Sequence, residues 1–305
     1  MNALKLQILI PVRERSPLLA ETLATITPQL NAECAVLVVD DLADGFDVAY
    51  VNAVDKATAE YVWLFADDDH FLPGAIDAVL QAINSPSSIL HPPDLIVANS
   101  SVRDRTMQHV TKAKWLDHHD FTTPNRETVL VLLADLMSYV GSIIIRRDVW
   151  QETVARVGAQ YMGTRFITFA VPAAARVQSV AFVSHVCTAV RYGHQSWCGD
   201  CARLNGTFKE IVWGLEDISD EAKAAIAPKV DAMWQWLAWH AANVPLPAGA
   251  PVRKAVIQTI PAWLLRKCLR LALWLVGQSN CMTARNLREA DEDFTDRLCQ
   301  QPILK

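Results

Sequence analysis

The stretch Tyr61-Val-Trp-Leu-Phe-Ala-Asp67-Asp-Asp69 sets an apolar run directly before three consecutive aspartates. A short apolar run that ends at polar residues is typical of a strand buried on both faces of a sheet. Similar runs lie at residues 6–10, 34–39 and 94–99, and segments with helical spacing separate them. Strands that alternate with helices predict βαβ units and a mostly parallel sheet.

The alternation continues beyond residue 126 and then changes. The remaining elements are predicted as strands at 141–145 and 180–190 and as helices at 16–29, 48–58, 73–83, 127–137, 147–157 and 166–175. Beyond about residue 206 the pattern is helical only, at 205–215, 220–243 and 259–277. We therefore predict an α/β domain over residues 1–205 and a helical C-terminal extension over residues 206–305.

Polar clusters follow the first three strands. The clusters are Pro11-Val-Arg13-Glu14, Asp40-Asp41 and Asp67-Asp68-Asp69. Because open α/β sheets bind ligands at the carboxyl ends of their parallel strands, we expect the three clusters to converge there. Adjacent carboxylates repel one another unless a positive charge compensates, and Mg²⁺ or Mn²⁺ bound together with substrate phosphates does so. The alternative is that the aspartate triplet is a solvated turn and helix cap.

Three segments in this order resemble a family 2 glycosyltransferase of the GT-A fold. The segments are Ile8-Leu-Ile-Pro11-Val12, Val36-Leu-Val-Val-Asp40-Asp41 and Tyr61 to Ile76. Four stretches resemble the abequosyltransferase-like group, namely Trp63-Leu-Phe-Ala-Asp67-Asp-Asp69, Asp94-Leu-Ile-Val-Ala-Asn99-Ser-Ser-Val102, Gly163-Thr-Arg165-Phe166-Ile167 and Arg191-Tyr-Gly193. The resemblance implies an α/β nucleotide-sugar-binding domain with a mostly parallel mixed sheet. It also implies transfer of a hexosyl or deoxyhexosyl group in bacterial surface-polysaccharide assembly, such as that of the lipopolysaccharide O-antigen.

The resemblance assigns nucleotide-sugar binding to the first two clusters. Pro11, Arg13 and Glu14 would line the nucleotide pocket. Asp40 or Asp41 would bind the base or the ribose through hydrogen bonds that a carboxylate accepts. The resemblance therefore predicts a nucleoside-diphosphate-sugar as the donor.

The same resemblance assigns a divalent cation, Mn²⁺ or Mg²⁺, to the aspartate triplet. When the family motif is aligned on Pro73, its first aspartate falls on Ala66, which is a departure from the usual pattern. Asp68 and Asp69 then become the predicted metal ligands, and Asp67 a residue that binds the donor. The metal would neutralise the charge that develops on the leaving diphosphate.

The expected catalytic base is missing from its family position. Inverting members carry a Glu-Asp pair there, whereas residues 161–166 contain no carboxylate. The nearest titratable cluster is 117–120, from which Asp120 is the candidate base, and a solvated loop is the alternative. Arg165 is a candidate for binding a phosphate or a charged acceptor, and its alternative is an ion pair at the start of a helix.

Cys198-Gly-Asp-Cys201 has the spacing of half a zinc knuckle. A structural zinc site needs four ligands, and no second pair with this spacing follows. His185, Cys187 and His194 are close enough in sequence to complete a set. Reduced cysteines in a loop are the favoured interpretation.

The C-terminal part combines tryptophan with positive charge. Residues 252–288 hold seven basic residues and no Asp or Glu, and the apolar residues of 259–277 recur at helical spacing. A basic amphipathic helix of this kind fits an anionic membrane surface, and the alternative is a helix packed on the α/β domain. The net charge of −5 disfavours a nucleic-acid partner. With neither a signal peptide nor a spanning segment recognised, we expect a cytoplasmic protein, peripheral at the inner face of the plasma membrane.

These observations predict a metal-dependent glycosyltransferase that acts on a hydroxyl of a glycan or polyprenyl-linked acceptor. The alternative is a non-catalytic GT-A-like protein that docks at the membrane and organises a glycan-assembly complex. A nucleotidyltransferase is disfavoured, because residues 11–16 contain no glycine for a phosphate-binding loop.

Overall fold

The computed structural model describes residues 4–12, 17–40, 45–84, 91–192 and 201–243. The predictions made for Arg13, Glu14, Asp41, Cys198 and the basic segment 252–288 therefore lie outside the described residues. Contacts group residues 1–241 as one compact unit and residues 242–305 as another. The predicted boundary near residue 205 stays a prediction.

The first unit is built on one mixed sheet in the order β2-β1-β3-β8-β5-β9-β4, with β6 beside β5 and β7 beside β9. The strands are β1 (Leu6–Pro11), β2 (Cys34–Val39), β3 (Tyr61–Leu64), β4 (His70–Phe71), β5 (Leu95–Arg103), β6 (Val110–Lys112), β7 (Phe121–Thr123), β8 (Ile143–Arg146) and β9 (Val180–Arg191). β1 pairs in parallel with β2 and β3, and β5 pairs in parallel with β9. β8 is antiparallel to both β3 and β5, so all the long strands share one direction. The predicted mostly parallel sheet is confirmed.

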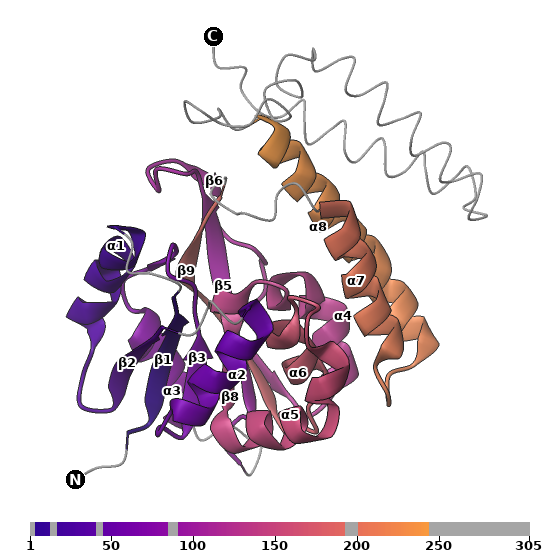
Figure 1. The fold of residues 1–305 in the computed structure, drawn as a ribbon, viewed down its shortest axis with the longest axis horizontal. Coiled ribbons are helices and arrows are strands. Elements are labelled where there is room, and N and C mark those ends of the chain that lie inside the picture. Colours follow the sequence, from indigo (N-terminus) through magenta and orange to yellow (C-terminus); the bar gives the residue numbers. More distant parts are fainter. Residues whose placement is uncertain (1–3, 13–16, 41–44, 85–90, 193–200, 244–305) are drawn as a thin grey trace. The chain divides into compact units, whose positions relative to one another are not determined.

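Helices pack around the sheet in Figure 1, and the last two that the structure describes, α7 and α8, lie farther from the strands than the others. They are α1 (Pro17–Ile26), α2 (Phe46–Lys56), α3 (Ala75–Asn84), α4 (Arg126–Met137), α5 (Arg147–Tyr161), α6 (Ile167–Ala174), α7 (Cys201–Gly214) and α8 (Asp220–Asn243), with 3-10 turns at Thr27–Gln29 and Val140–Ser142. None of the helices that the structure describes is long and apolar enough to cross a membrane.

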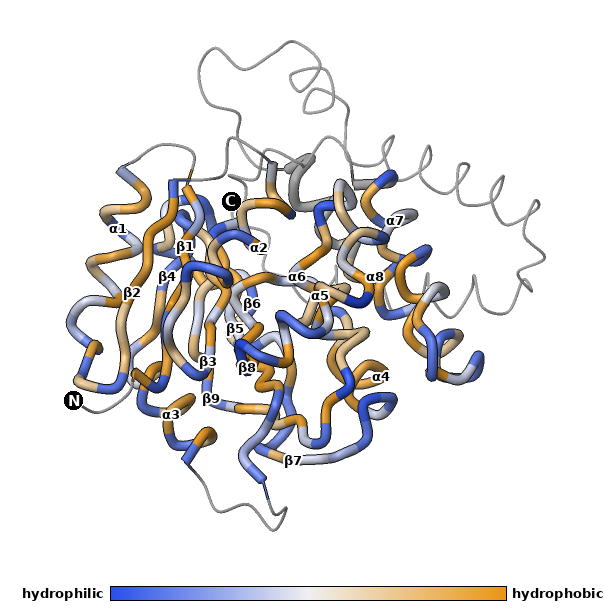
Figure 2. The backbone as a smooth tube through the Cα atoms, turned by 60° about the horizontal axis from the view of Figure 1, so that its bottom comes forward, coloured by the Kyte–Doolittle hydropathy of each residue, from blue (hydrophilic) through white to orange (hydrophobic). Residues whose placement is uncertain are grey.

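The core lies on both faces of the central strands. Leu6, Ile8 and Ile10 pack in one cluster with apolar residues of α1 and α3. Successive residues of a strand point to opposite faces, so the equally buried Leu9 faces the side on which α2 contacts β1. In Figure 2 hydrophobic residues lie along the strands themselves. Burial on both faces explains why the sequence shows continuous apolar runs instead of alternation.

Two local differences from the sequence prediction have physical causes. The strand predicted at 141–145 begins at Ile143, because Val140–Ser142 forms a 3-10 turn that places the Gly141 carbonyl 2.9 Å from the buried Trp63 indole nitrogen. The strand predicted at 94–99 continues to Arg103, because Asn99 and the serines after it are buried in the ladder with β9.

Candidate functional site

The strand ends converge as the sequence predicted. β1, β2 and β3 run in parallel, with Pro11 opposite Val39 in the register. Pro11, Asp40 and the aspartate triplet therefore lie at the same edge of the sheet. Pro11 is buried and Asp40 is exposed. This edge is where ligands bind in open α/β sheets.

Two helices fix the backbone at and just before the segment Asp67–Asp69, which we call the acidic turn. From α1, the Thr22 hydroxyl donates to the carbonyl oxygens of Asp67, at 3.0 Å, and Asp69, at 2.7 Å. From α2, the Tyr50 hydroxyl donates to the Phe65 carbonyl oxygen at 2.9 Å. Both side chains are buried, so these hydrogen bonds are shielded from water. The acidic turn is therefore held from two sides before any ligand binds.

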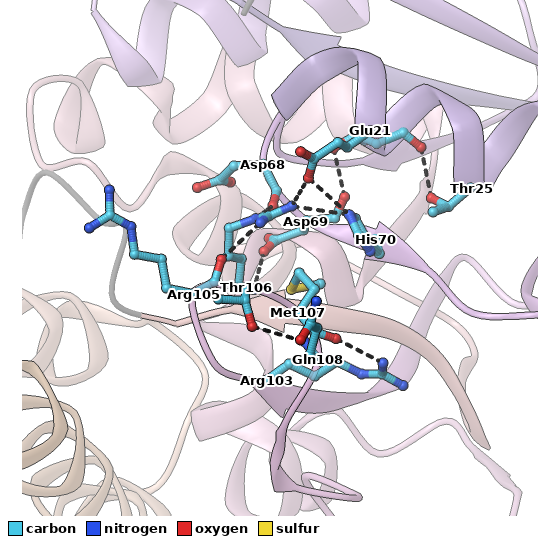
Figure 3. A network of polar contacts seen from close by, with 12 residues as sticks. Glu21, Thr25, Asp68, Asp69, His70, Arg103, Arg105, Thr106, Met107 and Gln108 are labelled. Carbon is cyan, nitrogen blue, oxygen red and sulfur yellow. Dashed lines mark hydrogen bonds and ion pairs between the residues drawn. The ribbon is translucent and has the colours of Figure 1, made fainter. Parts of the chain in front are cut away.

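Within the acidic turn the carboxylates have different surroundings. Asp69 is 4% exposed, and its Oδ1 accepts the backbone N–H of Arg191 at 2.6 Å. The phenol of Tyr139 lies beside it, and burial raises the pKa of both groups well above their usual values. Asp67 and Asp68 are partly exposed, and Figure 3 shows the Asp68 carboxylate pointing away from the Asp69 carboxylate. The alternative of a solvated turn does not fit the buried Asp69.

The buried Arg191 guanidinium joins the acidic turn to its neighbours. Its Nε donates to the Asp68 carbonyl oxygen at 2.7 Å and its Nη1 to the Arg105 carbonyl oxygen at 2.9 Å. Its Nη2 pairs with the Glu21 carboxylate at 2.6 Å and lies 3.1 Å from His70 Nε2. Burial, together with the Arg191 charge, lowers the pKa of His70, which fits a neutral ring that accepts from Arg191. The sequence offers one signal for Arg191, which is an arginine that directly follows the apolar residues at the end of a strand.

The protein supplies some of the ligands that a divalent cation needs at this edge of the sheet, and a substrate would supply the others. Among the described residues no three His, Cys, Asp or Glu side chains gather as a ready metal site. Asp68 and Asp67 offer carboxylate oxygens, which are the hard ligands that Mg²⁺ and Mn²⁺ prefer. Such ions commonly bind through one or two carboxylates and complete their shell with substrate phosphates and water. The residues present therefore fit a metal that arrives with a phosphorylated substrate.

A second buried carboxylate, Asp47, organises the segment that carries Arg165. The two oxygens of Asp47 accept the backbone N–H groups of Arg165 at 2.8 Å and Ile167 at 3.1 Å, at the start of α6. Burial raises the pKa of Asp47, although the surrounding backbone N–H groups oppose that shift. Arg165 adopts a left-handed φ of 67°, and its side chain is exposed. At the start of this helix a carboxylate binds the Arg165 backbone, and the alternative of an ion pair through the Arg165 side chain is not what the structure shows. Binding of a phosphate or a charged acceptor by Arg165 stays a prediction.

Asp120 does not lie with the acidic turn. Its Oδ1 accepts the backbone N–H of Ser184 at 2.6 Å, and it lines a shallow hollow of about 440 Å³ with Lys114 and His185. Ser184 precedes Arg191 on β9 by a distance on the order of 20 Å, at about 3.3 Å per residue. A general base must come within hydrogen-bond reach of its proton, so this position does not support the predicted role of Asp120 as the base.

No family model and no curated protein matches this chain. Solved structures do match: residues 1–349 of S. aureus TarS align with a TM-score of 0.51 and 11% identity, over 80% of this chain and 76% of that chain. The same fragment in complex with UDP-GlcNAc aligns with a TM-score of 0.51 and 10% identity, over 75% and 72%. The mannosyltransferase PcManGT from Pyrobaculum calidifontis, in complex with GDP-Man and Mn²⁺, aligns with a TM-score of 0.48 and 13% identity, over 89% and 81%. The TarS alignments confirm the predicted GT-A-type α/β fold, and the abequosyltransferase-like group stays a prediction.

Proposed function

We propose that this chain is a metal-dependent glycosyltransferase. It moves a sugar from a nucleoside-diphosphate-sugar to a hydroxyl of a glycan or lipid-linked glycan acceptor in bacterial surface-polysaccharide assembly. The observation that carries the proposal is the acidic turn, which α1, α2 and Arg191 fix at the carboxyl edge of parallel strands. The matching fold of TarS, which was solved with UDP-GlcNAc, supports a UDP-sugar as the first donor to test.

In this proposal Asp68, with Asp67 beside it, holds Mn²⁺ or Mg²⁺ through carboxylate oxygens. When bound, the metal supplies positive charge against which the diphosphate leaves the anomeric carbon. Asp40 takes the ribose or base, and Pro11 lines the nucleotide side of the edge. Asp69, which the sequence predicts as a metal ligand, has a different role in this proposal: it is buried and its Oδ1 accepts the Arg191 backbone N–H, so it orients the turn from inside.

The test is thermal unfolding in the presence of CDP, UDP, GDP and dTDP, each with and without Mn²⁺. We expect one of them to raise the melting temperature in a Mn²⁺-dependent manner, because a ligand that binds only the folded state stabilises it. Asp68→Ala should abolish that shift. Asp77→Ala is the matched control, since Asp77 is an exposed aspartate in the first turn of α3. The proposal fails if no nucleotide shifts the wild-type protein, or if both variants respond alike.

A non-catalytic GT-A-like docking protein is the second candidate, and two sequence features favour it. Ala66 stands where the family has its first aspartate, and residues 161–166 lack a carboxylate. This candidate predicts liposome binding through residues 252–288 without donor hydrolysis. Turnover of UDP-GlcNAc or another sugar nucleotide, measured as released nucleoside diphosphate, decides against it.

A further inference from the structure

The hairpin between β5 and β6 holds Arg105 in a fixed backbone position. The Asp104 carboxylate accepts the backbone N–H groups of Gln108 at 3.0 Å and His109 at 3.1 Å, and the Thr106 hydroxyl at 2.8 Å. Met107 adopts a left-handed φ of 62° and buries its side chain, which closes the turn tightly. A hairpin with this many internal bonds presents its side chains from a defined position.

Arg191 connects this hairpin to the acidic turn. One guanidinium donates to the carbonyl oxygens of both Asp68 and Arg105, so the two carbonyls lie less than about 10 Å apart. The guanidinium is only 5% exposed and is anchored by Glu21. The planar fork of Arg191 therefore sets the distance between the two backbone segments, which a lysine could not do.

The side chains of Asp68 and Arg105 both leave the buried network. Figure 3 shows the Arg105 side chain extending to the side on which the Asp68 carboxylate also points. Arg105 is partly exposed, and none of the ion pairs among the described residues involves its guanidinium. A carboxylate and a guanidinium thus face the same region, and they extend from two backbone segments that Arg191 holds together.

We propose that Arg105 binds the diphosphate of the donor beside the metal on Asp68, and that Arg191 is the positioning residue for both. This inference rests on the proposed glycosyltransferase function. In the transfer, the bond between the anomeric carbon and the diphosphate oxygen breaks, a bond from the anomeric carbon to the acceptor oxygen forms, and the acceptor hydroxyl releases its proton to solvent. The electron pair of the broken bond stays on the diphosphate, so the nucleoside diphosphate carries about one more negative charge than it did in the donor. A divalent cation balances two charges, and Arg105 meets the remaining one with a forked pair of donors.

The experiment measures Mn²⁺ binding and nucleotide binding separately, on the full chain. Electron paramagnetic resonance reports Mn²⁺ alone. Isothermal titration calorimetry in the presence of Mn²⁺ measures the affinity for UDP, CDP, GDP and dTDP and for the corresponding monophosphates. The variants are Arg105→Gln, Arg105→Lys, Arg191→Lys and, as a matched control, Arg176→Gln, an exposed arginine before β9 at the opposite edge of the sheet.

We expect Arg105→Gln to bind Mn²⁺ like the wild type and to lose about 10-fold to 100-fold in affinity for the diphosphate, the range of charge-assisted hydrogen bonds. The affinity of Arg105→Gln for the nucleoside monophosphate should fall by less than about 3-fold. Arg105→Lys should bind the diphosphate more tightly than Arg105→Gln but less tightly than the wild type. Arg191→Lys should weaken Mn²⁺ and diphosphate together while thermal unfolding shows that it is folded. Arg176→Gln should change neither.

Three outcomes would overturn the inference in different ways. If the wild type binds a diphosphate with Mn²⁺ and Arg105→Gln binds it equally well, Arg105 has no such role and the proposed function stands. If the wild type binds none of the nucleotides, the proposed function and this inference fall together. If Arg105→Gln proves unfolded, Arg105→Lys decides, because unchanged affinity for every nucleotide with a normal melting temperature would contradict a forked contact.

Discussion

Replacing Thr22 by valine tests whether α1 holds the acidic turn. The Thr22 hydroxyl is fully buried and donates to two carbonyl oxygens, those of Asp67 and Asp69. Valine keeps the β-branched shape in α1 but removes the donor, so at least one buried carbonyl loses its partner. An unsatisfied buried group costs about 1–3 kcal/mol, and we therefore expect a loss of about 2 kcal/mol in the free energy of unfolding.

Urea unfolding measures that loss, and Thr153→Val is the matched control. Thr153 is 2% exposed, but its hydroxyl donates to the Val149 carbonyl oxygen within its own helix, so its removal leaves local helix bonding intact. We expect the control to lose clearly less stability than Thr22→Val, because no carbonyl outside its own helix loses a donor. In thermal unfolding, Thr22→Val should lower the midpoint by roughly 4–8 °C, as expected for a unit of this size.

The same variant links stability to the site. If the acidic turn needs Thr22, Mn²⁺ affinity should fall several-fold in Thr22→Val and stay unchanged in Thr153→Val. Equal losses of stability in the two variants would refute the claim that the Thr22 hydrogen bonds brace the turn. A loss of stability without a change in Mn²⁺ affinity would show that the Thr22 hydrogen bonds do not affect metal binding, and it would contradict the proposed link.

Two further predictions use single side chains of the same unit. Gly141→Ala would set a Cβ 2.2 Å from the hydroxyl oxygen of the buried Tyr139, so we expect it to cost at least about 1–3 kcal/mol in urea unfolding. Gly206→Ala meets nothing within 4 Å inside α7 and should instead stabilise by up to about 1 kcal/mol. Burial raises the pKa of Asp47, so the protonated acid is favoured by folding, and its contribution is present below the unfolded pKa and lost as the pH rises through the folded pKa. The stability of the wild type relative to Asp47→Asn should therefore be greatest at acid pH and decline above about pH 4; a difference that grew with pH, measured by urea unfolding between about pH 3.5 and 7, would contradict this sign.

The sequence was informative where burial is continuous. The runs 6–10 and 61–65 could be assigned to strands because both faces of those strands are covered. The run 34–39 is equally apolar, although the middle residues of β2 are only partly buried. The parallel direction of the three strands followed from the helices between them. That direction alone placed Pro11, Asp40 and the acidic turn at one edge. The short strands β6 and β7 carry no such run, because their residues are partly or fully exposed.

The sequence could not predict which aspartate faces inward. The direction of Asp69 depends on Thr22 and on the Arg191 backbone, and no local pattern records contacts that span 47 and 122 residues. β8 lies antiparallel between β3 and β5, and the apolar runs of the sequence do not specify the order of strands in the sheet. Asp47 was missed for the same reason, since its partners at the start of α6 lie 118 and 120 residues away.

The hydrogen bonds of Arg191 also affect the order in which the protein folds. Asp68 and Arg191 are separated by 123 residues, so their hydrogen bond can form only after β9 has been synthesised and has paired with β5. Contacts of such long sequence separation are slow to form, because a large loop must close before they stabilise anything. Strands β1 to β3 can associate earlier, during elongation, while the acidic turn still lacks its last support. In refolding from urea, the far-ultraviolet circular dichroism of the sheet should therefore appear first. Mn²⁺ binding should follow, once β9 has paired with β5 and the acidic turn has its last support.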